Sequence, residues 1–225
     1  PNIIIKPNTL AIDLIQREHG NPNQGIAGVW CLDQVSQEVL TLSADIVFLA
    51  TGGVGQLWST TTNPSVATGD GLAMAYRAGA AVKDMAFIQF HPTALARQDD
   101  RPFLITEAVR GEGGVILDKA GLHAWQKATQ KARDEGGEEP LPDGFSFTLA
   151  HSPLGSMATR DIVARSIDQT MKQTGSAHVF LVTSHLDQTH LLAHFPTIQK
   201  RLDRPGLKLG REPLPVAPAA PYAAG

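Results

Sequence analysis

Three polar side chains alternate with apolar ones over residues 87–93 and form the first candidate for a binding site. Gln89, His91 and Thr93 are separated by Phe90 and Pro92. A strand would place the three polar groups on one face, because successive side chains point to opposite sides. This is a site-like arrangement. The alternative is a buried, hydrogen-bonded histidine with a structural role, which is the commoner fate of a lone histidine.

Two further segments combine charge with expected helix starts. Thr106 and Glu107 stand where a helix begins, and a carboxylate there is favoured by the helix dipole. Glu107 could equally form a simple i,i+3 ion pair with Arg110. Arg160 opens another expected helix, with Thr159 as its N-cap. A cation is unfavourable in a first turn, so Arg160 either has a role outside the helix or faces solvent.

A glycine-rich segment and an aspartate indicate where a ligand could approach the backbone. Residues 45–50 form a continuous apolar run, typical of a strand buried on both faces of a parallel sheet. Thr51-Gly52-Gly53 follows directly, and glycines there allow close approach, although a plain turn has the same pattern. Asp70 lies near the start of a helix expected within residues 68–80. Its carboxylate either caps free N–H groups or binds ligand hydroxyls.

The remaining pattern predicts short elements and one loop region. Residues 119–143 include a highly charged stretch and are expected to be a solvated insertion or mobile loop. Strands are expected at 3–5, 10–15, 26–32, 38–42 and 178–182, and the third and fourth of these are expected to be antiparallel. One helix is expected from residue 159, with an apolar stripe of Val163, Ile167 and Met171, and another over 189–194. Residues 211–221 are expected to form an extended tail.

The composition is that of an ordinary globular chain. Of 225 residues, 42% are hydrophobic and 18% charged, with net charge −3. Lys and Arg are scattered, so we expect no nucleic-acid partner. No apolar run approaches the roughly 18 residues of a membrane span. The single cysteine, Cys31, excludes an internal disulfide and a Cys-rich metal site, and we expect no metal. The chain begins without Met and stops abruptly, so we expect an internal piece of a longer protein.

Several motifs in order resemble the succinate dehydrogenase/fumarate reductase flavoprotein family. Some of them are similar to the L-aspartate oxidases within that family, and the resemblance covers nearly the whole chain except residues 119–158. The family motifs are Ala50-Thr51-Gly52-Gly53, Thr68-Gly69-Asp70-Gly71, Phe90-His91-Pro92-Thr93, 106–113 and 160–165. Those similar to the oxidases are 89–95, 161–165, His194-Phe195-Pro196-Thr197-Ile198 and 213–220.

The resemblance implies an α/β or α+β fold, with a partial Rossmann-like FAD-binding domain interrupted by an α+β capping domain. Residues 1–88 would belong to the FAD-binding domain, residues 89–208 to the cap, and residues 209–225 to a return segment, with substrate between the domains. The fingerprint G-x-G-x-x-G does not occur in the chain, so we expect it to hold FAD weakly on its own. Pro221 stands where the family usually has a substrate-binding histidine.

The resemblance also implies roles for individual residues. Arg160 would be the catalytic residue that transfers a proton, with a carboxylate beside it as relay, because a guanidinium seldom gives up its proton. The substrate-binding residues would be His91, Thr106, Glu107 and Gln89, with Glu107 an alternative partner for a substrate ammonium. The cofactor-binding residues would be Asp70, Thr51, Gly52, Gly53 and Ala11.

The implied reaction is the FAD-dependent oxidation of L-aspartate to iminoaspartate, the first step of de novo NAD biosynthesis. Oxygen or fumarate would reoxidise the flavin. The alternatives are a succinate dehydrogenase or fumarate reductase flavoprotein subunit, and a non-catalytic truncated remnant. The implied partners are a small dicarboxylate, L-aspartate or fumarate, and quinolinate synthase. The implied location is the cytoplasm, or a plastid in a photosynthetic eukaryote.

Overall fold

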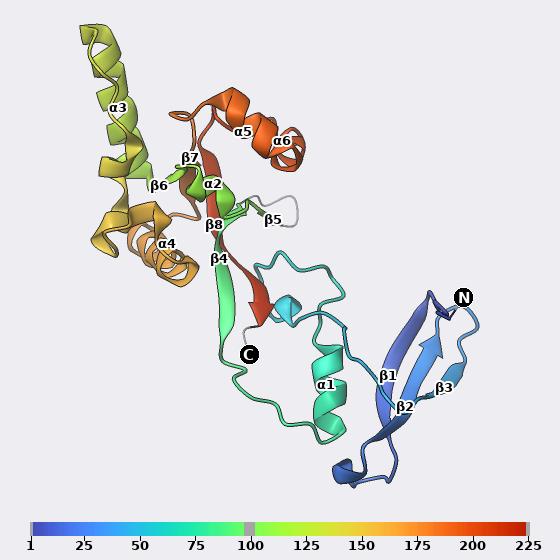
Figure 1. Ribbon diagram of the computed structural model, residues 1–225. Helices are drawn as coiled ribbons and strands as arrows, with labels where there is room; N and C mark the ends of the chain where they lie inside the picture. Colours follow the sequence, from blue (N-terminus) through green and yellow to red (C-terminus); the bar gives the residue numbers. More distant parts are fainter. Residues whose placement is uncertain (1, 97–101, 224–225) are drawn as a thin grey trace. The chain divides into compact units, whose positions relative to one another are not determined.

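The computed structural model describes residues 2–96 and 102–223, with side chains up to residue 220. The chain forms two compact units (Figure 1). The first comprises Pro1–Leu57, Asn63–Phe87 and Ala223–Gly225, and the second comprises Trp58–Thr62 and Ile88–Tyr222. The assignment of residues 1–88, 89–208 and 209–225 to FAD-binding and capping domains stays a prediction.

The first unit contains a three-stranded antiparallel sheet and one α-helix. The strands β1 (Thr9–Gln16), β2 (Ile26–Asp33) and β3 (Val39–Ser43) are arranged in the order β1-β2-β3, which confirms the three strands expected there. Helix α1 (Asp70–Arg77) is also confirmed. It is tied to β1 by an ion pair of 2.8 Å between Arg77 Nε and Asp13 Oδ2. Short 3₁₀ turns lie at Pro22–Gln24 and Gly55–Leu57.

Two strands predicted in the first unit are wrong. Residues 3–5 and 45–50 form no helix or strand. Their side chains are largely exposed, and Phe48 is 90% exposed. An apolar run becomes a doubly buried strand only when neighbouring strands and covering helices surround it. In the described part of this unit the sheet consists of β1, β2 and β3 alone, and they leave residues 46–50 unpaired.

The second unit is built on a five-stranded sheet in the order β5-β4-β8-β7-β6. The pairs β4–β5, β6–β7 and β7–β8 are antiparallel, and Leu181 of β7 lies between Ile116 and Leu214 of its neighbours. Strands β4, β7 and β8 confirm the expectations for 87–93, 178–182 and the extended tail. The strands are β4 (Ile88–Leu95), β5 (Phe103–Leu104), β6 (Val115–Leu117), β7 (Val179–Val182) and β8 (Leu214–Ala223).

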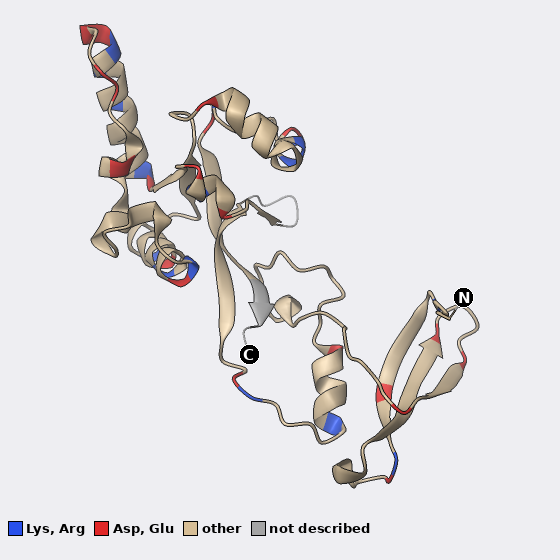
Figure 2. Ribbon diagram, viewed as in Figure 1, with Lys and Arg blue, Asp and Glu red and all other residues tan. Residues whose placement is uncertain are grey.

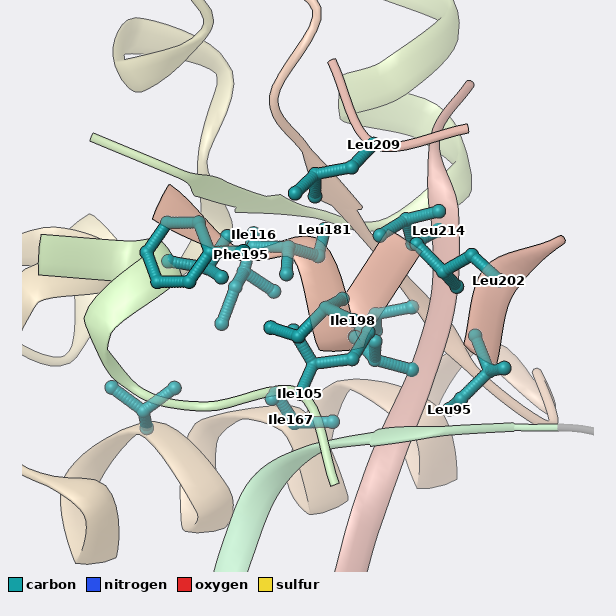
Figure 3. Packing of buried hydrophobic residues seen from close by; sticks show 14 of the residues in the cluster. Leu95, Ile105, Ile116, Ile167, Leu181, Phe195, Ile198, Leu202, Leu209 and Leu214 are labelled. Atoms are coloured by element: carbon teal, nitrogen blue, oxygen red, sulfur yellow. The ribbon is translucent and has the colours of Figure 1, made fainter. Parts of the chain in front are cut away.

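Helices pack on this sheet around one main hydrophobic core (Figure 3). Ile105, Ile116, Ile167, Leu181 and Leu214 are all fully buried. Burying each such side chain contributes about 1.5–3 kcal/mol. The helices are α2 (Ala108–Gly111), α3 (Lys119–Glu135), α4 (Arg160–Thr174), α5 (Gln188–His194) and α6 (Pro196–Leu202), with 3₁₀ turns at Pro142–Phe145, Phe147–Ala150 and Gly155–Met157.

Helix α4 confirms the predicted apolar stripe. Val163 and Ile167 are buried, and Met171 packs against the core. Thr159 is the N-cap residue, but its hydroxyl donates to the Asp161 carboxylate at 2.6 Å and makes no cap bond to the backbone. Helix α5 is confirmed, whereas α6, which begins at Pro196, was not predicted.

The prediction of a loop over residues 119–143 is wrong, because α3 occupies most of this segment. Leu122, Trp125 and Thr129 recur at helical spacing and are buried. Asp118 caps the start, accepting from the Gly121 N–H at 2.7 Å, and Gly136 ends the helix in the left-handed region at φ +67°. Figure 2 shows acidic and basic positions near the C-terminal end of α3. High charge here marks a solvated helix face, not a loop.

Candidate active site

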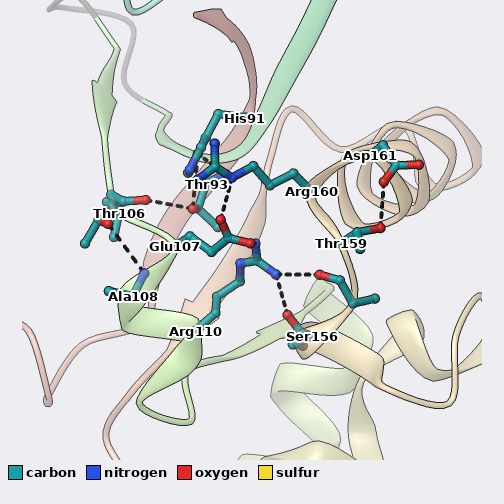
Figure 4. Close-up of polar contacts among 12 residues, drawn as sticks. His91, Thr93, Thr106, Glu107, Ala108, Arg110, Ser156, Thr159, Arg160 and Asp161 are labelled. Carbon is teal, nitrogen blue, oxygen red and sulfur yellow. Dashed lines mark hydrogen bonds and ion pairs between the residues drawn. The ribbon is translucent and has the colours of Figure 1, made fainter.

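Segments far apart in the sequence bring a group of polar side chains together in the second unit (Figure 4). Strand β4 carries Gln89, His91 and Thr93, which share a face because strand side chains alternate. Glu107 is the N-cap residue of α2, and Arg160 is the first residue of α4. We call Gln89, His91, Glu107, Arg110 and Arg160 the polar cluster.

One carboxylate holds two arginines in the polar cluster. Glu107 Oε2 accepts a short hydrogen bond from Arg160 Nε, and Glu107 Oε1 accepts from Arg110 Nη2 at 3.1 Å. Arg160 Nη1 also donates to Gln89 Oε1 at 3.3 Å. Two guanidinium groups around one carboxylate leave a net positive charge. This arrangement can attract an anionic ligand.

Arg110 differs from Arg160 in its surroundings. It is 1% exposed, and its Nη1 donates to the carbonyls of Ser156 at 2.6 Å and Ala158 at 3.2 Å. Burial lowers the pKa of Arg110, although the charge of Glu107 opposes the shift. Arg110 therefore ties α2 to the segment that leads into α4. It fixes Glu107 where Arg160 can reach it.

The remaining charges of the cluster are open to solvent. The side chains of Arg160 and Glu107 are 38% and 39% exposed. Burial alone raises the pKa of Glu107, but the hydrogen bond from Arg160 and the charges of Arg160 and Arg110 outweigh it, and the net pKa is lowered. Glu107 is therefore ionised at neutral pH, and the Arg160 side chain is partly accessible from solvent.

His91 is a neutral hydrogen-bond donor in this setting. It is 2% exposed. Burial, with the positive charges of Arg160 and Arg110, lowers its pKa to about 4. The backbone N–H of Thr93 donates to His91 Nδ1 at 3.3 Å, so the ring proton of the neutral imidazole lies on Nε2. The hydroxyl of Thr93 donates to the Ile105 carbonyl at 2.9 Å.

Four of the five residues predicted for catalysis and substrate binding are linked to one another in this cluster. Gln89, Glu107 and Arg160 are joined by hydrogen bonds, and His91 is close enough for the charge of Arg160 to shift its pKa. Thr106 adjoins Glu107, and its hydroxyl accepts from the Ala108 N–H at 3.4 Å.

Arg110 was missed as a site residue. The i,i+3 spacing correctly predicted its ion pair with Glu107. Its burial could not be read from the spacing, because it depends on the Ser156 and Ala158 carbonyls, more than forty residues away.

A second group of predicted residues lies in the first unit. A Cβ on Gly71 would lie 1.9 Å from Thr51 Oγ1, so the missing side chain of Gly71 allows Thr51 to pack on the first turn of α1, beside Asp70. Gly52 has φ +81° and open space where a Cβ would stand. Asp70 accepts a hydrogen bond of 2.8 Å from the Thr68 hydroxyl, and the N-cap position belongs to Gly69.

These features leave the Thr51-Gly52-Gly53 backbone accessible next to a carboxylate and a helix N-terminus. Such a combination suits the hydroxyls and phosphates of a dinucleotide. Ala11, the remaining predicted cofactor residue, lies in β1 in register with Cys31. The contacts among Thr51, Gly71 and Asp70 do not include it.

A cavity of about 400 Å³ lies elsewhere in the second unit and is lined in part by Trp58, Phe90 and Met171. Phe90 alternates with Gln89 and His91 along β4, so it faces the other side of the strand. The cavity is therefore not the polar cluster. Its lining is mostly apolar, apart from groups such as Arg165 and Asp168.

Comparison with known families identifies the family of this chain. A family model described as FAD binding domain matches residues 1–225. The chain belongs to the FAD-binding domain family. FAD is thus its cofactor, as the resemblance implied. The open backbone at Gly52 and the carboxylate of Asp70 fit such a group.

Individual relatives agree with this family. L-aspartate oxidase 1 of Ralstonia nicotianae is 42% identical over 226 residues, which cover 100% of this chain and 38% of that protein. The chloroplastic L-aspartate oxidase 2-b of Nicotiana tabacum is 38% identical, with 100% and 32% covered. The chain therefore spans well under half the length of these curated relatives.

Solved structures of two flavoproteins share the fold of this chain. The quinol fumarate reductase of E. coli superposes with a TM-score of 0.72 at 27% identity, over 96% of this chain and 35% of that chain. Sdh1 of Mycobacterium smegmatis gives 0.64 at 26%, over 96% and 32%. The predicted mixed α and β fold is confirmed. The resemblance to the succinate dehydrogenase/fumarate reductase flavoprotein family is confirmed as well. Among the described residues, no helix is both long enough and apolar enough to cross a membrane.

Proposed function

We propose that this FAD-binding protein oxidises L-aspartate to iminoaspartate. The observation that carries the proposal is the polar cluster, in which Glu107 holds Arg160 beside the neutral imidazole of His91. The relatives named L-aspartate oxidase are 37–42% identical to this chain, whereas the fumarate reductase and Sdh1 structures are 26–28% identical. This difference favours aspartate over succinate as substrate.

A dicarboxylate requires hydrogen-bond donors and positive charge. In the proposal, Nε2–H of His91 and the hydroxyl of Thr106 donate to one substrate carboxylate. Gln89 orients Arg160 through the bond to its Nη1. Because His91 is neutral, it contributes a directed donor and no charge. The positive charge of the cluster comes from the arginines.

Proton movement in the proposal follows the chain of ion pairs. Arg160 contacts the substrate, and Glu107 bonds Arg160 and Arg110 through its two oxygens. The Glu107 carboxylate is 39% exposed, so it can exchange a proton with solvent on one side and with Arg160 on the other, which gives Arg160 the relay that an arginine requires. Glu107 retains free lone pairs for a substrate ammonium, a group that succinate and fumarate lack.

FAD, when bound, supplies the two-electron acceptor for the hydride that leaves Cα of the substrate. Thr51, Gly52, Gly53 and Asp70 would hold it in the first unit, and Ala11 is retained as a further contact in the proposal. The backbone N–H groups of the two glycines suit phosphate oxygens, and the Asp70 carboxylate suits a hydroxyl.

Substrate preference tests the proposal. The purified protein, reconstituted with FAD, is assayed with L-aspartate and with succinate, and with either oxygen or fumarate as electron acceptor. Turnover of aspartate without turnover of succinate supports the oxidase. The reverse preference identifies a succinate dehydrogenase or fumarate reductase flavoprotein subunit instead. A folded protein that binds FAD but turns over neither substrate indicates a non-catalytic remnant.

Location and protein partners are part of the proposal. The named relatives include chloroplastic enzymes of plants, so a plastid location applies if the source is a photosynthetic eukaryote, and otherwise a cytoplasmic one. Iminoaspartate is a reactive imine, and an enzyme that consumes it at once would limit its hydrolysis. We therefore propose that the protein associates with quinolinate synthase, and co-purification of the two proteins tests this association.

A further inference from the structure

A second cluster of potential ligands lies outside the polar cluster, between the end of α2 and helix α5. Glu112 is the C-cap residue of α2, and His190 and His194 stand four residues apart on α5. Glu112 Oε2 lies 3.1 Å from His190 Nε2, and the two imidazole rings are 4.6 Å apart between centroids. One possible ligand atom of each residue lies within 4.8 Å of the others.

We propose that Glu112, His190 and His194 bind one divalent transition-metal ion, with Zn²⁺ as the reference ion. Two imidazoles and a carboxylate form a ligand set that zinc, copper, nickel and cobalt accept, whereas Mg²⁺ and Ca²⁺ prefer oxygen ligands alone. In a tetrahedral zinc site the ligand atoms lie about 3.3 Å apart. The Glu112–His190 separation of 3.1 Å is close to this value, and the proposal requires the exposed His194 side chain to move inward from a separation of at most 4.8 Å.

The backbone around the cluster is well anchored, so the ligands need little reorganisation. Leu191 and Phe195 directly follow the two histidines and are buried in the core. His185 Nε2 donates to the Gly113 carbonyl at 3.0 Å, which ties the residue after Glu112 to the segment before α5. The three ligand side chains themselves are exposed, so an ion reaches them from solvent and water completes the coordination.

This site would join α2, which carries Arg110 and follows Glu107, to α5. Metal binding here depends only on the chemistry and geometry of the three side chains, and not on the proposed oxidase activity. Metal binding can therefore fail while the oxidase proposal stands, and the reverse also holds.

Isothermal titration of the purified, tag-free, metal-free protein with Zn²⁺ tests the inference. We expect one Zn²⁺ per chain. His190→Ala and His194→Ala should each weaken the affinity at least about tenfold, because even the loss of a residue that only supports a metal ligand costs about 10–100-fold. His123→Ala, which removes an exposed histidine on α3, serves as the matched control and should bind as the unmodified protein does. Mg²⁺ should produce no binding heat.

Glu112→Gln provides a second route if a histidine variant fails to fold, because the amide keeps the shape of the side chain and removes its charge. We expect weaker Zn²⁺ binding in this variant and a weaker rise in the thermal unfolding midpoint on adding Zn²⁺. The inference is overturned if Zn²⁺ does not bind at millimolar concentration, or if folded variants at all three positions bind it as the unmodified protein does.

Discussion

Replacing Arg110 should mainly lower the stability of the fold, whereas replacing Arg160 should mainly abolish flavin reduction. Arg110→Met removes the donor to the buried carbonyls of Ser156 and Ala158 and one partner of Glu107. An unsatisfied buried acceptor costs about 1–3 kcal/mol, and loss of one partner from a buried pair costs about 3–5 kcal/mol. Because Glu107 is partly solvated, the two carbonyls dominate. Two such acceptors are left unsatisfied, so we expect the free energy of unfolding to fall by about 2–6 kcal/mol.

Arg160→Met should behave differently, although it removes another partner of the same carboxylate. Both side chains of the Arg160–Glu107 pair are more than one-third exposed, and such pairs contribute about 0–1 kcal/mol. Flavin reduction by aspartate should nevertheless be lost, because Arg160 is the proposed catalytic residue. Arg165→Ala is the matched control, since its pair with Asp161 is 75% and 65% exposed. It should change neither stability nor activity.

Urea unfolding followed by circular dichroism measures these differences, provided that the slope with denaturant stays the same among variants. The reasoning is refuted if Arg110→Met unfolds within about 1 kcal/mol of the unmodified protein. It is equally refuted if Arg160→Met loses as much stability as Arg110→Met. Either result would mean that burial does not separate the roles of the two arginines.

Three further predictions concern the relay, the histidine and the cofactor segment. Glu107→Gln should lower the rate of flavin reduction at saturating aspartate about 10²–10⁴-fold, measured by stopped flow, because general acid–base groups contribute that much; an unchanged rate contradicts the relay. The pKa of His91 is about 4 in the folded chain and about 6.5 in the unfolded chain. Between pH 6.5 and pH 4 only the unfolded chain binds this proton, which favours unfolding. The free energy of unfolding should therefore decrease by up to about 3 kcal/mol as the pH falls from 6.5 to 4. His91→Gln should flatten this dependence in urea unfolding, and equal slopes in both proteins would count against it. Gly71→Ala should displace Thr51 and weaken FAD binding, measured by flavin fluorescence. Gly144→Ala should not weaken FAD binding, because a Cβ at this position meets open space. Equal FAD affinities in the two variants would contradict the proposed cofactor segment.

The sequence predicted the parts of the site that depend on local spacing. Alternation along β4 placed Gln89 and His91 on one face. The unfavourable position of Arg160 in a first helical turn allowed either a role outside its helix or a solvent-facing side chain. In the structure Arg160 pairs with the carboxylate of Glu107, the N-cap residue of α2, which offsets the unfavourable dipole interaction. The burial of Arg110 escaped prediction, because its partners come from a distant segment.

Two errors in the fold have a common physical origin. The apolar run at 45–50 predicts a buried strand, but burial depends on neighbours that a local pattern does not supply. The charge around 127–139 was taken for a loop, although Leu122, Trp125 and Thr129 already followed helical spacing. In both segments the overall polarity of the residues was a poorer guide to structure than strand pairing at 45–50 and helical periodicity at 122–129.

The central claim is that Arg160 and its partners form the site at which aspartate is oxidised. Anaerobic mixing of the FAD-loaded protein with L-aspartate, followed by flavin absorbance in a single turnover, tests it most directly. We predict rapid bleaching of the flavin in the unmodified protein, and none in an Arg160→Gln variant that retains FAD and unfolds at the same urea concentration. Bleaching at the same rate in Arg160→Gln would contradict the claim.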